Sequence, residues 1–349
     1  MITSLSGIMS VSGFEYRAQD KIRELFAPYF DEIKTDRVGN HTLIKRCGRE
    51  GAPKILVDAH FDEIGMLVSD VLEGGFLRIV NVGGIDPSIM QAADVVVYGK
   101  EQLHGVVASI PPHLRVDDDG KLPSVDELIV DVGLGYTLDE LREIAPVGTP
   151  VGFLPCYSEL GEGYIAGKSF DNKACAAIAA CAIIDTLPKD MAGDVYLSLS
   201  AREEVANIGG VSPVCFNESP DYAMVIDVNL GDAPDAPERE TVPMGKGVSI
   251  CFSAATDREL SRATQSLCEK KEIPFTLCVC PSTTGTNATV VNIVEEGIPV
   301  VDIGLPLRNM HTYNEVISLE DCLTLYNTVA AFVCSAEIAD RFSKEVAYD

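Results

Sequence analysis

The amino-acid sequence predicts an α/β protein whose sheet carries helices on both faces and is interrupted by a small, β-rich insert. Over most of the chain, strand-like apolar runs alternate with helical patterns of ten or more residues, which is typical of a sheet covered on both sides. Residues 64 to 158 break this alternation because they contain short alternating runs and little helix. The 349 residues suffice for two domains.

Hydrophobic periodicity, together with the turn-forming residues between apolar runs, predicts the positions of the helices and strands in the α/β part. Helical spacing predicts helices at Tyr16–Phe30, Asn172–Thr186, Asp257–Lys271, Ala288–Glu296 and Leu319–Ser343. Apolar runs predict a pair of strands at His41–Lys45 and Lys54–Ala59, and further strands at Asp194–Ser200, Tyr222–Val228, Gly247–Ala254, Pro274–Cys280 and Ile298–Ile303.

The insert is expected to be a small barrel-like module. Alternating runs such as Phe76–Val80 and Val95–Tyr98 are separated by glycine and proline pairs, and Leu138–Ile144 is the one helical pattern. We therefore expect residues 1–63 and 159–349 to form one discontinuous domain and residues 64–158 to form the other.

Composition limits the partners and the compartment. The 53 acidic against 27 basic residues give a net charge of -26, which repels phosphate backbones and anionic lipids, so we expect neither nucleic acid nor membrane as partner. The amino terminus lacks the pattern of a secretory signal. The longest apolar run, Ala174–Ile184, is shorter than the ~18 residues of a membrane span. Eleven scattered cysteines fit reduced thiols, which predicts a cytoplasmic protein.

Cys278 and Cys280 admit two interpretations. They could be half of a zinc site, or two small apolar groups on one buried face of the strand Pro274–Cys280. The sequence favours the second.

Ionisable side chains gather where predicted strands end. His60 and Asp62 follow the strand Lys54–Ala59, and Glu203 and Glu204 follow Asp194–Ser200. The remaining candidates are Asp171 at the start of a predicted helix, Asp227 within Tyr222–Val228, and His311 after Ile298–Ile303. Each alone has an ordinary explanation, such as a helix cap, a turn former or a solvated surface group. Together they fit the edge of an open α/β sheet, where such folds place their sites.

The donor types predict a metal centre. Two imidazoles with several carboxylates suit Zn²⁺, Co²⁺ or Mn²⁺, and a carboxylate can bridge two such ions ~3.5 to 4 Å apart. Five ligands, two imidazoles and three carboxylates, exceed what one open catalytic zinc needs, so we expect two divalent ions.

Ordered motifs along nearly the whole chain resemble the M42 family of metalloaminopeptidases, which includes glutamyl and tetrahedral aminopeptidases. They are Ser12–Glu15, Asp58–Gly65, Val82–Pro87, Ile110–Leu114 and Arg308–His311. The resemblance implies a zinc-peptidase-like catalytic domain, with a mixed sheet sandwiched by helices and an inserted β-barrel-like dimerisation domain. It also implies removal of N-terminal residues from peptide substrates, and self-association into dimers and dodecamers.

The resemblance assigns roles to the candidate residues. It implies that His60 and Asp227 hold one metal, that Glu204 and His311 hold the other, and that Asp171 bridges them.

It further implies that Glu203 is the general base and acid, and that Asp62 orients the His60 imidazole. Asp58 and Glu63 are expected to be plain polar flanks. The histidines at 41, 104 and 113 match no ligand position and are expected to be structural.

Four positions depart from the family pattern: Ala206 and Asn287, where the family has Gly and Asp, and Asn309 and Thr312, where it has Tyr and Ser. We expect Asn287 to affect the choice of substrate side chain. Arg202 fits equally a clamp for a substrate carboxylate and a surface ion pair.

Alternative functions remain open at this point. An acylase or deacetylase would use the same chemistry with another pocket, and a glycosidase would need a carboxylate pair without metal. A catalytically silent assembly subunit is disfavoured, because it would have no use for five costly ligand positions.

Overall fold

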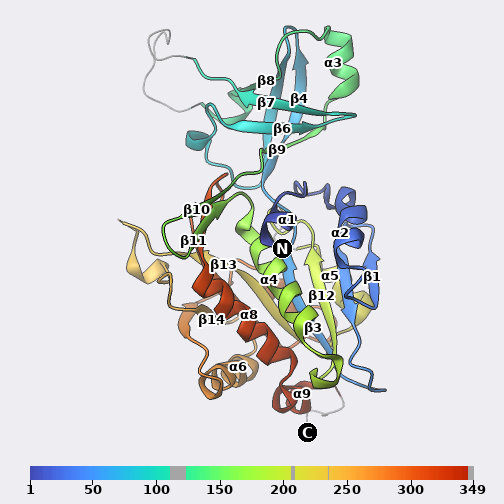
Figure 1. Ribbon diagram of the computed structural model, residues 1–349, viewed down its shortest axis with the longest axis vertical. Helices are drawn as coiled ribbons and strands as arrows, with labels where there is room; N and C mark the ends of the chain where they lie inside the picture. Colours follow the sequence, from blue (N-terminus) through green and yellow to red (C-terminus); the bar gives the residue numbers. More distant parts are fainter. Residues whose placement is uncertain (111–122, 206–208, 235, 345–349) are drawn as a thin grey trace.

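A computed structural model describes residues 1–110, 123–205, 209–234 and 236–344 of the chain. Figure 1 shows a large α/β body and a smaller β body that projects from one end of it. The large body contains an eleven-stranded mixed sheet, and the small one is a closed barrel. The two-part α/β architecture predicted from the sequence is confirmed.

The large sheet places four parallel strands side by side at its centre. Its main path runs β1-β2-β12-β3-β13-β16-β17-β11-β10, and β14 and β15 branch from β16. The bounds are β1 Glu32–Thr35, β2 His41–Lys45, β3 Lys54–His60, β10 Tyr157–Leu160, β11 Tyr164–Gly167, β12 Asp194–Ser200, β13 Tyr222–Leu230, β14 Val248–Ser253, β15 Phe275–Cys280, β16 Val300–Arg308 and β17 Glu315–Ser318. Since β12, β3, β13 and β16 are parallel, their carboxyl ends meet at one edge.

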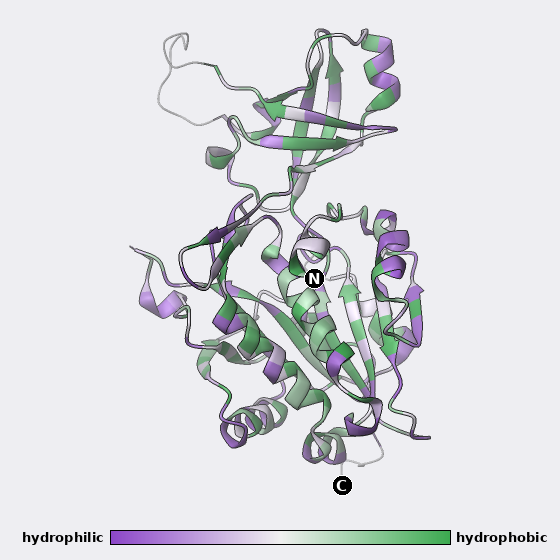
Figure 2. Cartoon of the chain, viewed as in Figure 1, coloured by the Kyte–Doolittle hydropathy of each residue, from purple (hydrophilic) through white to green (hydrophobic). Residues whose placement is uncertain are grey.

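Helices cover both faces of this sheet. They are α1 Ile2–Ser6, α2 Gln19–Phe26, α4 Phe170–Asp185, α5 Val211–Glu218, α6 Arg258–Lys270, α7 Ala288–Val291, α8 Leu319–Val333 and α9 Ala336–Phe342. Alternate residues of β3 show the two faces: Val57 packs in the cluster that contains α4 and α8, and Leu56 packs in the cluster that contains α5 and α7. Apolar colour accordingly concentrates on the inner strands and helices in Figure 2.

The barrel closes in the order β4-β5-β8-β7-β6-β9. Its strands are β4 Gly65–Leu72, β5 Phe76–Val82, β6 Asp94–Tyr98, β7 Gln102–Val107, β8 Ile129–Asp131 and β9 Pro150–Phe153, and α3 spans Leu138–Ile144. Their inward side chains form a hydrophobic core separate from that of the large body. All these elements lie inside the predicted insert.

Two predicted helices are shorter than expected. The helix predicted at Ala288–Glu296 ends at Val291, because the following residues shift to i→i+3 hydrogen bonds and Glu295 takes a positive φ of 57°. The helix predicted at Leu319–Ser343 breaks after Val333, since Ser335 starts α9 by accepting a hydrogen bond from the backbone N–H of Ile338.

The helix predicted at Tyr16–Phe30 is also corrected: it begins as a 3₁₀ turn and ends at Phe26. The strands β2 and β3 are not hydrogen-bonded to each other, because β12 lies between them. Among the described residues, no single helix has the length and apolar character to cross a bilayer, although the bent pair α8 and α9 passes that test jointly.

Candidate metal centre

The predicted site residues converge at the carboxyl edge of the parallel strands. His60 is the last residue of β3 and pairs in register with Ser200, the last residue of β12, which places Glu203 and Glu204 beside it. Asp227 lies on β13, the neighbour of β3 on its other side. His311 follows the end of β16 at Arg308. A single sheet edge therefore collects residues that are up to 251 positions apart in the sequence.

The five predicted ligands form two overlapping triads of possible metal-binding atoms. The first consists of His60, Asp171 and Asp227, and the second of Asp171, Glu204 and His311. Within each triad the ligand atoms all lie within 4.8 Å of one another.

Asp171 belongs to both triads and turns one oxygen toward each. Its Oδ1 lies 3.1 Å from His60 Nε2, and its Oδ2 lies 3.6 Å from His311 Nε2. The other contacts in the triads are Asp227 Oδ1 to His60 Nε2 at 3.6 Å and Glu204 Oε2 to His311 Nε2 at 3.3 Å. A carboxylate placed between two ligand groups in this way has the geometry of a bridging ligand.

Asp171 stands before the regular part of α4. Its φ of -73° and ψ of 105° are not helical, so the side chain is not directed as an ordinary helical residue would direct it. The backbone N–H of Asp171 donates to Glu315 Oε2 at 2.9 Å, and the backbone N–H of His311 donates to Glu315 Oε1 at 3.1 Å. The buried Glu315 thus holds the backbone of two of the predicted ligands. Sequence analysis missed it, although a carboxylate in an apolar strand four residues after His311 is a usable clue.

The imidazole of His311 is oriented by the barrel segment. Its Nδ1 lies 3.0 Å from the carbonyl oxygen of Gly84, to which an Nδ1–H donates, and this leaves Nε2 directed at the carboxylates. A Cβ at residue 84 would approach His311 Nδ1 to 2.9 Å, so glycine makes this close contact possible. This explains why the motif Val82–Pro87 of the insert belongs with the site.

Asp62 contacts His60 through both its backbone oxygen and its carboxylate. The nearest partner of His60 Nδ1 is the backbone oxygen of Asp62, at 3.1 Å, whereas the Asp62 carboxylate lies 3.5 Å away. That carboxylate accepts the backbone N–H of Glu203 at 3.0 Å and of Glu204 at 3.1 Å. Asp62 therefore fixes the backbone of the glutamate pair as well as the histidine.

The two adjacent glutamates point to different neighbours. Glu204 contacts His311, while Glu203 Oε2 lies 4.0 Å from His60 Nε2 and belongs to neither triad. Glu203 also lines a cavity of about 340 Å³ together with Thr283, Thr286 and Asn287. A carboxylate that borders both the ligand cluster and an open cavity can meet a substrate.

Crowded carboxylates dominate the electrostatics. Burial, Asp227 and Glu204 raise the pKa of Glu203 to about 8, and burial and Asp171 raise the pKa of Glu204 to about 7. A hydrogen bond to Glu204 raises the pKa of His311 to about 9. Burial lowers the pKa of His60, but its carboxylate neighbours outweigh burial and raise it well above its usual range.

The raised pKa values of Glu204 and of the two histidines favour the protonated forms of these groups. Among the described residues, the ion-pair partners of Asp171, Glu204 and Asp227 are His60 and His311, with no lysine or arginine. Two imidazoles and three carboxylates without a permanent cation form a donor set that fits divalent metal ions, whose binding would displace those protons.

Asp58 and Glu63 are not plain polar flanks, because both are fully buried. Glu63 forms ion pairs with Lys168 at 2.5 Å and Lys173 at 3.0 Å. Asp58 accepts a hydrogen bond from Asn287 Nδ2 at 2.9 Å. The hydrophobic periodicity of the sequence placed these carboxylates at a strand end. It could not reveal their partners, which lie more than 100 residues away along the chain.

The family departures fall in different surroundings. Asn287 is buried, and its Nδ2 also donates to Ser200 Oγ at 2.9 Å, a role that an aspartate could not fill. Arg202 is exposed, with a positive φ of 60°, and its backbone N–H donates to Glu15. Thr312 Oγ1 donates to the carbonyl oxygen of Asn309. Ala206, His113 and most of the motif Ile110–Leu114 lie outside the described residues.

The remaining histidines have structural partners. His41 Nδ1 lies 2.9 Å from Thr35 Oγ1 and its Nε2 lies 3.1 Å from the carbonyl oxygen of Glu15, and the exposed His104 pairs with Asp94.

Comparison with known proteins gives consistent matches along the chain. The profile of the M42 glutamyl aminopeptidase family matches residues 39–327. A lysyl aminopeptidase of Pyrococcus furiosus is 30% identical over 318 residues, which cover 89% of this chain and 89% of that protein.

Solved structures agree with the sequence matches. An aminopeptidase from the archaeon Desulfurococcus kamchatkensis superposes with a TM-score of 0.88 at 28% identity, covering 100% of this chain and 98% of that one. The TET1 peptidase of Pyrococcus horikoshii, described as assembling into a tetrahedron or a large octahedral shell, has a TM-score of 0.82 at 26% identity and covers 94% of this chain and 97% of that one.

Proposed function

The chain belongs to the M42 family of aminopeptidases, and on that premise we propose that it is a two-metal enzyme that removes N-terminal residues from peptides. Asp171, which shares its two oxygens between the two triads, is the observation that carries the proposal. A single ion would need one triad; a second, complete triad around the same carboxylate supports two. His60 and Asp227 would hold one ion, Glu204 and His311 the other.

The cofactor would be a pair of Zn²⁺ or Co²⁺ ions, with Mn²⁺ as a further possibility for the same donors. When bound, two such ions lower the pKa of water and polarise a carbonyl oxygen, which is the chemistry that peptide hydrolysis needs. The chain's own residues would hold the ions and transfer protons.

Glu203 is the proposed general base and acid. It belongs to neither triad and, unlike the carboxylates of Asp62 and Glu315, it lines the cavity beside Asn287. Burial and the neighbouring Asp227 and Glu204 raise the pKa of Glu203 to about 8, which supports a role in accepting a proton. In the reaction Glu203 would take a proton from the attacking water and deliver it to the leaving amine. Asp62 would act as a positioning residue, since it holds the backbone of Glu203 and the ring of His60.

The test is hydrolysis of aminoacyl p-nitroanilides by protein stripped with a chelator and then supplied with Zn²⁺ or Co²⁺. We expect no release of p-nitroaniline by the stripped protein and restored release after metal addition. The matched substrate is the same compound with an acetylated amino group, which an aminopeptidase should leave intact. Removal of the acetyl group instead would favour the acylase reading, and inactivity on every substrate with metal present would favour a silent assembly subunit.

We also propose that the chain self-associates through the barrel, first into dimers and then into a larger shell such as a dodecamer. The support is the likeness to TET peptidases, one of which is described as a dodecamer, with a TM-score of 0.81 and 26% identity. Sedimentation of the whole protein tests this. A monomer at micromolar concentration would contradict it.

A further inference from the structure

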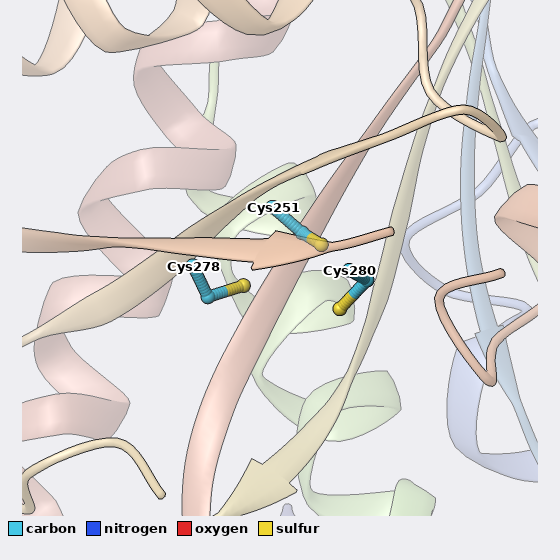
Figure 3. A group of neighbouring side chains, drawn as sticks. All are labelled: Cys251, Cys278 and Cys280. Carbon is cyan, nitrogen blue, oxygen red and sulfur yellow. The ribbon is translucent and has the colours of Figure 1, made fainter. Parts of the chain in front are cut away.

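Three cysteines outside the hydrolytic site lie together on one face of the sheet. Cys251 on β14 pairs in register with Cys278 on β15, and Cys280 is two residues further along β15. Because alternate residues of a strand point to the same face, all three thiols project on one side. Figure 3 shows their sulfur atoms turned toward one another. The sulfurs all lie within 4.8 Å of one another.

The sequence interpretation of Cys278 and Cys280 as small buried groups needs correction. They do share a face of the strand, but both are only partly buried, and the buried Cys251 joins them from the neighbouring strand. The structure places them at the open side of β15, which pairs with β14 alone. Solvent and ions can therefore reach two of the three thiols.

The surroundings act differently on the three thiols: the hydrogen bond to Cys278 and burial raise the pKa of Cys251, burial raises the pKa of Cys280, and Cys278 is the one with a lowered pKa. The Cys251 thiol, the Ser249 hydroxyl and Cys280 outweigh burial and lower the pKa of Cys278 to about 7. Asp302 on β16 pairs in register with Cys251, so its buried carboxyl group lies on the same face as the thiols. The net charge of -26 adds a general attraction for cations.

We propose that Cys251, Cys278 and Cys280 form a thiolate site for one thiophilic divalent ion of the Zn²⁺ type, separate from the hydrolytic centre. Binding would release a proton from each thiol and form three metal–sulfur bonds. Sulfurs ~2.3 Å from a common zinc ion lie roughly 3.8 to 4 Å apart, which small side-chain rotations reach from the present spacing. Imidazole and carboxylate ligands make the hydrolytic site chemically different, so the two sites can be loaded and detected separately.

A disulfide explains the cluster less well. Cys278 and Cys280 are two residues apart in one extended strand, where their Cα atoms are roughly 6.6 Å apart, near the upper limit of disulfide geometry. A bond between Cys251 and either of them would leave the third thiol unpaired in the same cluster. A metal ion uses all three.

The segment that follows β15 connects the cysteine cluster to the cavity beside Glu203. Residues 281 to 287 connect β15 to α7, and the Ser282 carbonyl oxygen accepts a hydrogen bond from Ser253 at the end of β14. Thr286, in the same segment, donates to Asp302 at 3.3 Å and lines the cavity beside Glu203. A metal ion that ties β14 to β15 would therefore anchor one wall of that cavity.

The experiment is titration of the reduced, full-length protein with Cd²⁺, a spectroscopic substitute for Zn²⁺, followed by ultraviolet sulfur-to-cadmium charge-transfer absorption. The carboxylate and imidazole ligands of the hydrolytic centre give no such band. We expect one band that saturates at one thiolate-bound ion per chain and is reversed by excess Zn²⁺. Bound Cd²⁺ should also protect Cys278 and Cys280 from alkylation, read by mass spectrometry.

Variants make the test specific. Cys278→Ser and Cys280→Ser change partly exposed positions and should lose the band, whereas Cys334→Ser and Cys181→Ser, partly buried thiols elsewhere, should keep it. Urea unfolding of each variant verifies that it is folded. Absence of the band in the wild-type protein, an unchanged band in both β15 variants, or a disulfide among the three cysteines in freshly purified protein would overturn the proposal. The readout does not depend on peptidase activity, so it stands or fails apart from the proposed function.

Discussion

Two clusters of buried charged side chains, one around His60 and one around Glu63, lie three residues apart in the sequence. They differ in how the negative charge of their carboxylates is balanced. Glu63 is surrounded by cations of the protein itself, with Lys168 and Lys173 on one of its oxygens and the backbone N–H of Ser10 on the other. Burial raises the pKa of Glu63, but the two lysines outweigh burial and bring it down to about 2. This carboxylate is charged at every physiological pH.

Within the part of the chain that the structure describes, no lysine or arginine compensates the carboxylates of the cluster around His60. Its carboxylates contact the two histidines, and burial raises the pKa of Asp227 and raises that of Glu204 to about 7. Isolated buried charge is costly. The described residues supply lysines to Glu63 but none to Asp171, Glu204 or Asp227, which fits the proposal that external cations balance the second cluster. The presence or absence of lysine partners therefore distinguishes a structural ion cluster from a candidate metal centre.

The largest expected effect comes from substitution of Glu203, which belongs to neither triad of predicted ligands. Glu203→Gln should lower kcat by roughly 10² to 10⁴, because the amide cannot take up a proton, while the protein still binds its metal ions. Kinetics together with metal analysis of the purified variant measure both quantities. The exposed Glu101→Gln is the control. Loss of bound metal in the Glu203 variant would instead make this residue a ligand.

Removing the anion of the compensated cluster should cost stability. Glu63→Gln leaves two buried lysines without a carboxylate, and breaking a buried ion pair in this way costs about 3–5 kcal/mol of the free energy of unfolding. Urea denaturation of metal-free protein measures the loss, again with Glu101→Gln as control. A change below about 0.5 kcal/mol, as for an ordinary surface substitution, would show that the lysines are satisfied without Glu63.

The same carboxylate predicts an acid dependence of stability. The pKa of Glu63 falls from 4.5 to about 2 on folding, so between these values the unfolded chain binds more protons and stability declines as the pH falls. The contribution is complete above pH 4.5, and its full loss on acidification corresponds to about 3 kcal/mol. Denaturation midpoints measured from pH 6 downward should fall less steeply in Glu63→Gln. Parallel curves for the two proteins would contradict the assignment.

The uncompensated cluster should respond to metal and the compensated one should not. At a free metal concentration 100 times Kd, ligand binding to the native state stabilises it by about 2.7 kcal/mol per site. Thermal unfolding with increasing Zn²⁺ should show this gain in the wild type and in Glu63→Gln, and a smaller gain in Asp227→Asn, which loses a ligand. Equal gains in all three proteins would place the stabilising ion elsewhere.

The smallest effect concerns the buried pair of Asn287 and Asp58. Asn287→Asp replaces a donor by a second carboxylate beside Asp58, and leaving a buried acceptor without its donor costs about 1–3 kcal/mol at neutral pH. Burial already raises the pKa of Asp58 to about 6, so the loss should shrink as the pH falls below that value. Urea denaturation at two pH values checks this, with the exposed Asn217→Asp as control.

Sequence patterns predicted the architecture because it depends on local periodicity. The strand ranges at β2 and β12 follow directly from runs of apolar residues whose period matches a buried strand. The clustering of His60 and Asp227 was predictable because the parallel strands β3 and β13 end at one edge, whereas the place of Asp171 at the start of α4 and the roles came from the family motifs.

What the sequence could not supply were partners distant along the chain. Lys168 and Lys173 lie near the start of the helix predicted at Asn172–Thr186, and nothing local links them to Glu63. Cys251 stands 27 positions before Cys278, and only the β14–β15 register brings the two together. The shortened α7 depends on a local change of hydrogen-bond pattern that apolar spacing does not reveal.

The most direct test of the central claim is a crystal structure of metal-loaded protein with anomalous scattering recorded at the absorption edge of the added zinc. We predict two separate peaks at the sheet edge, one at the triad of His60 and one at the triad of His311, with Asp171 between them. A single peak there, or none in protein that hydrolyses its substrate, would contradict a two-metal centre.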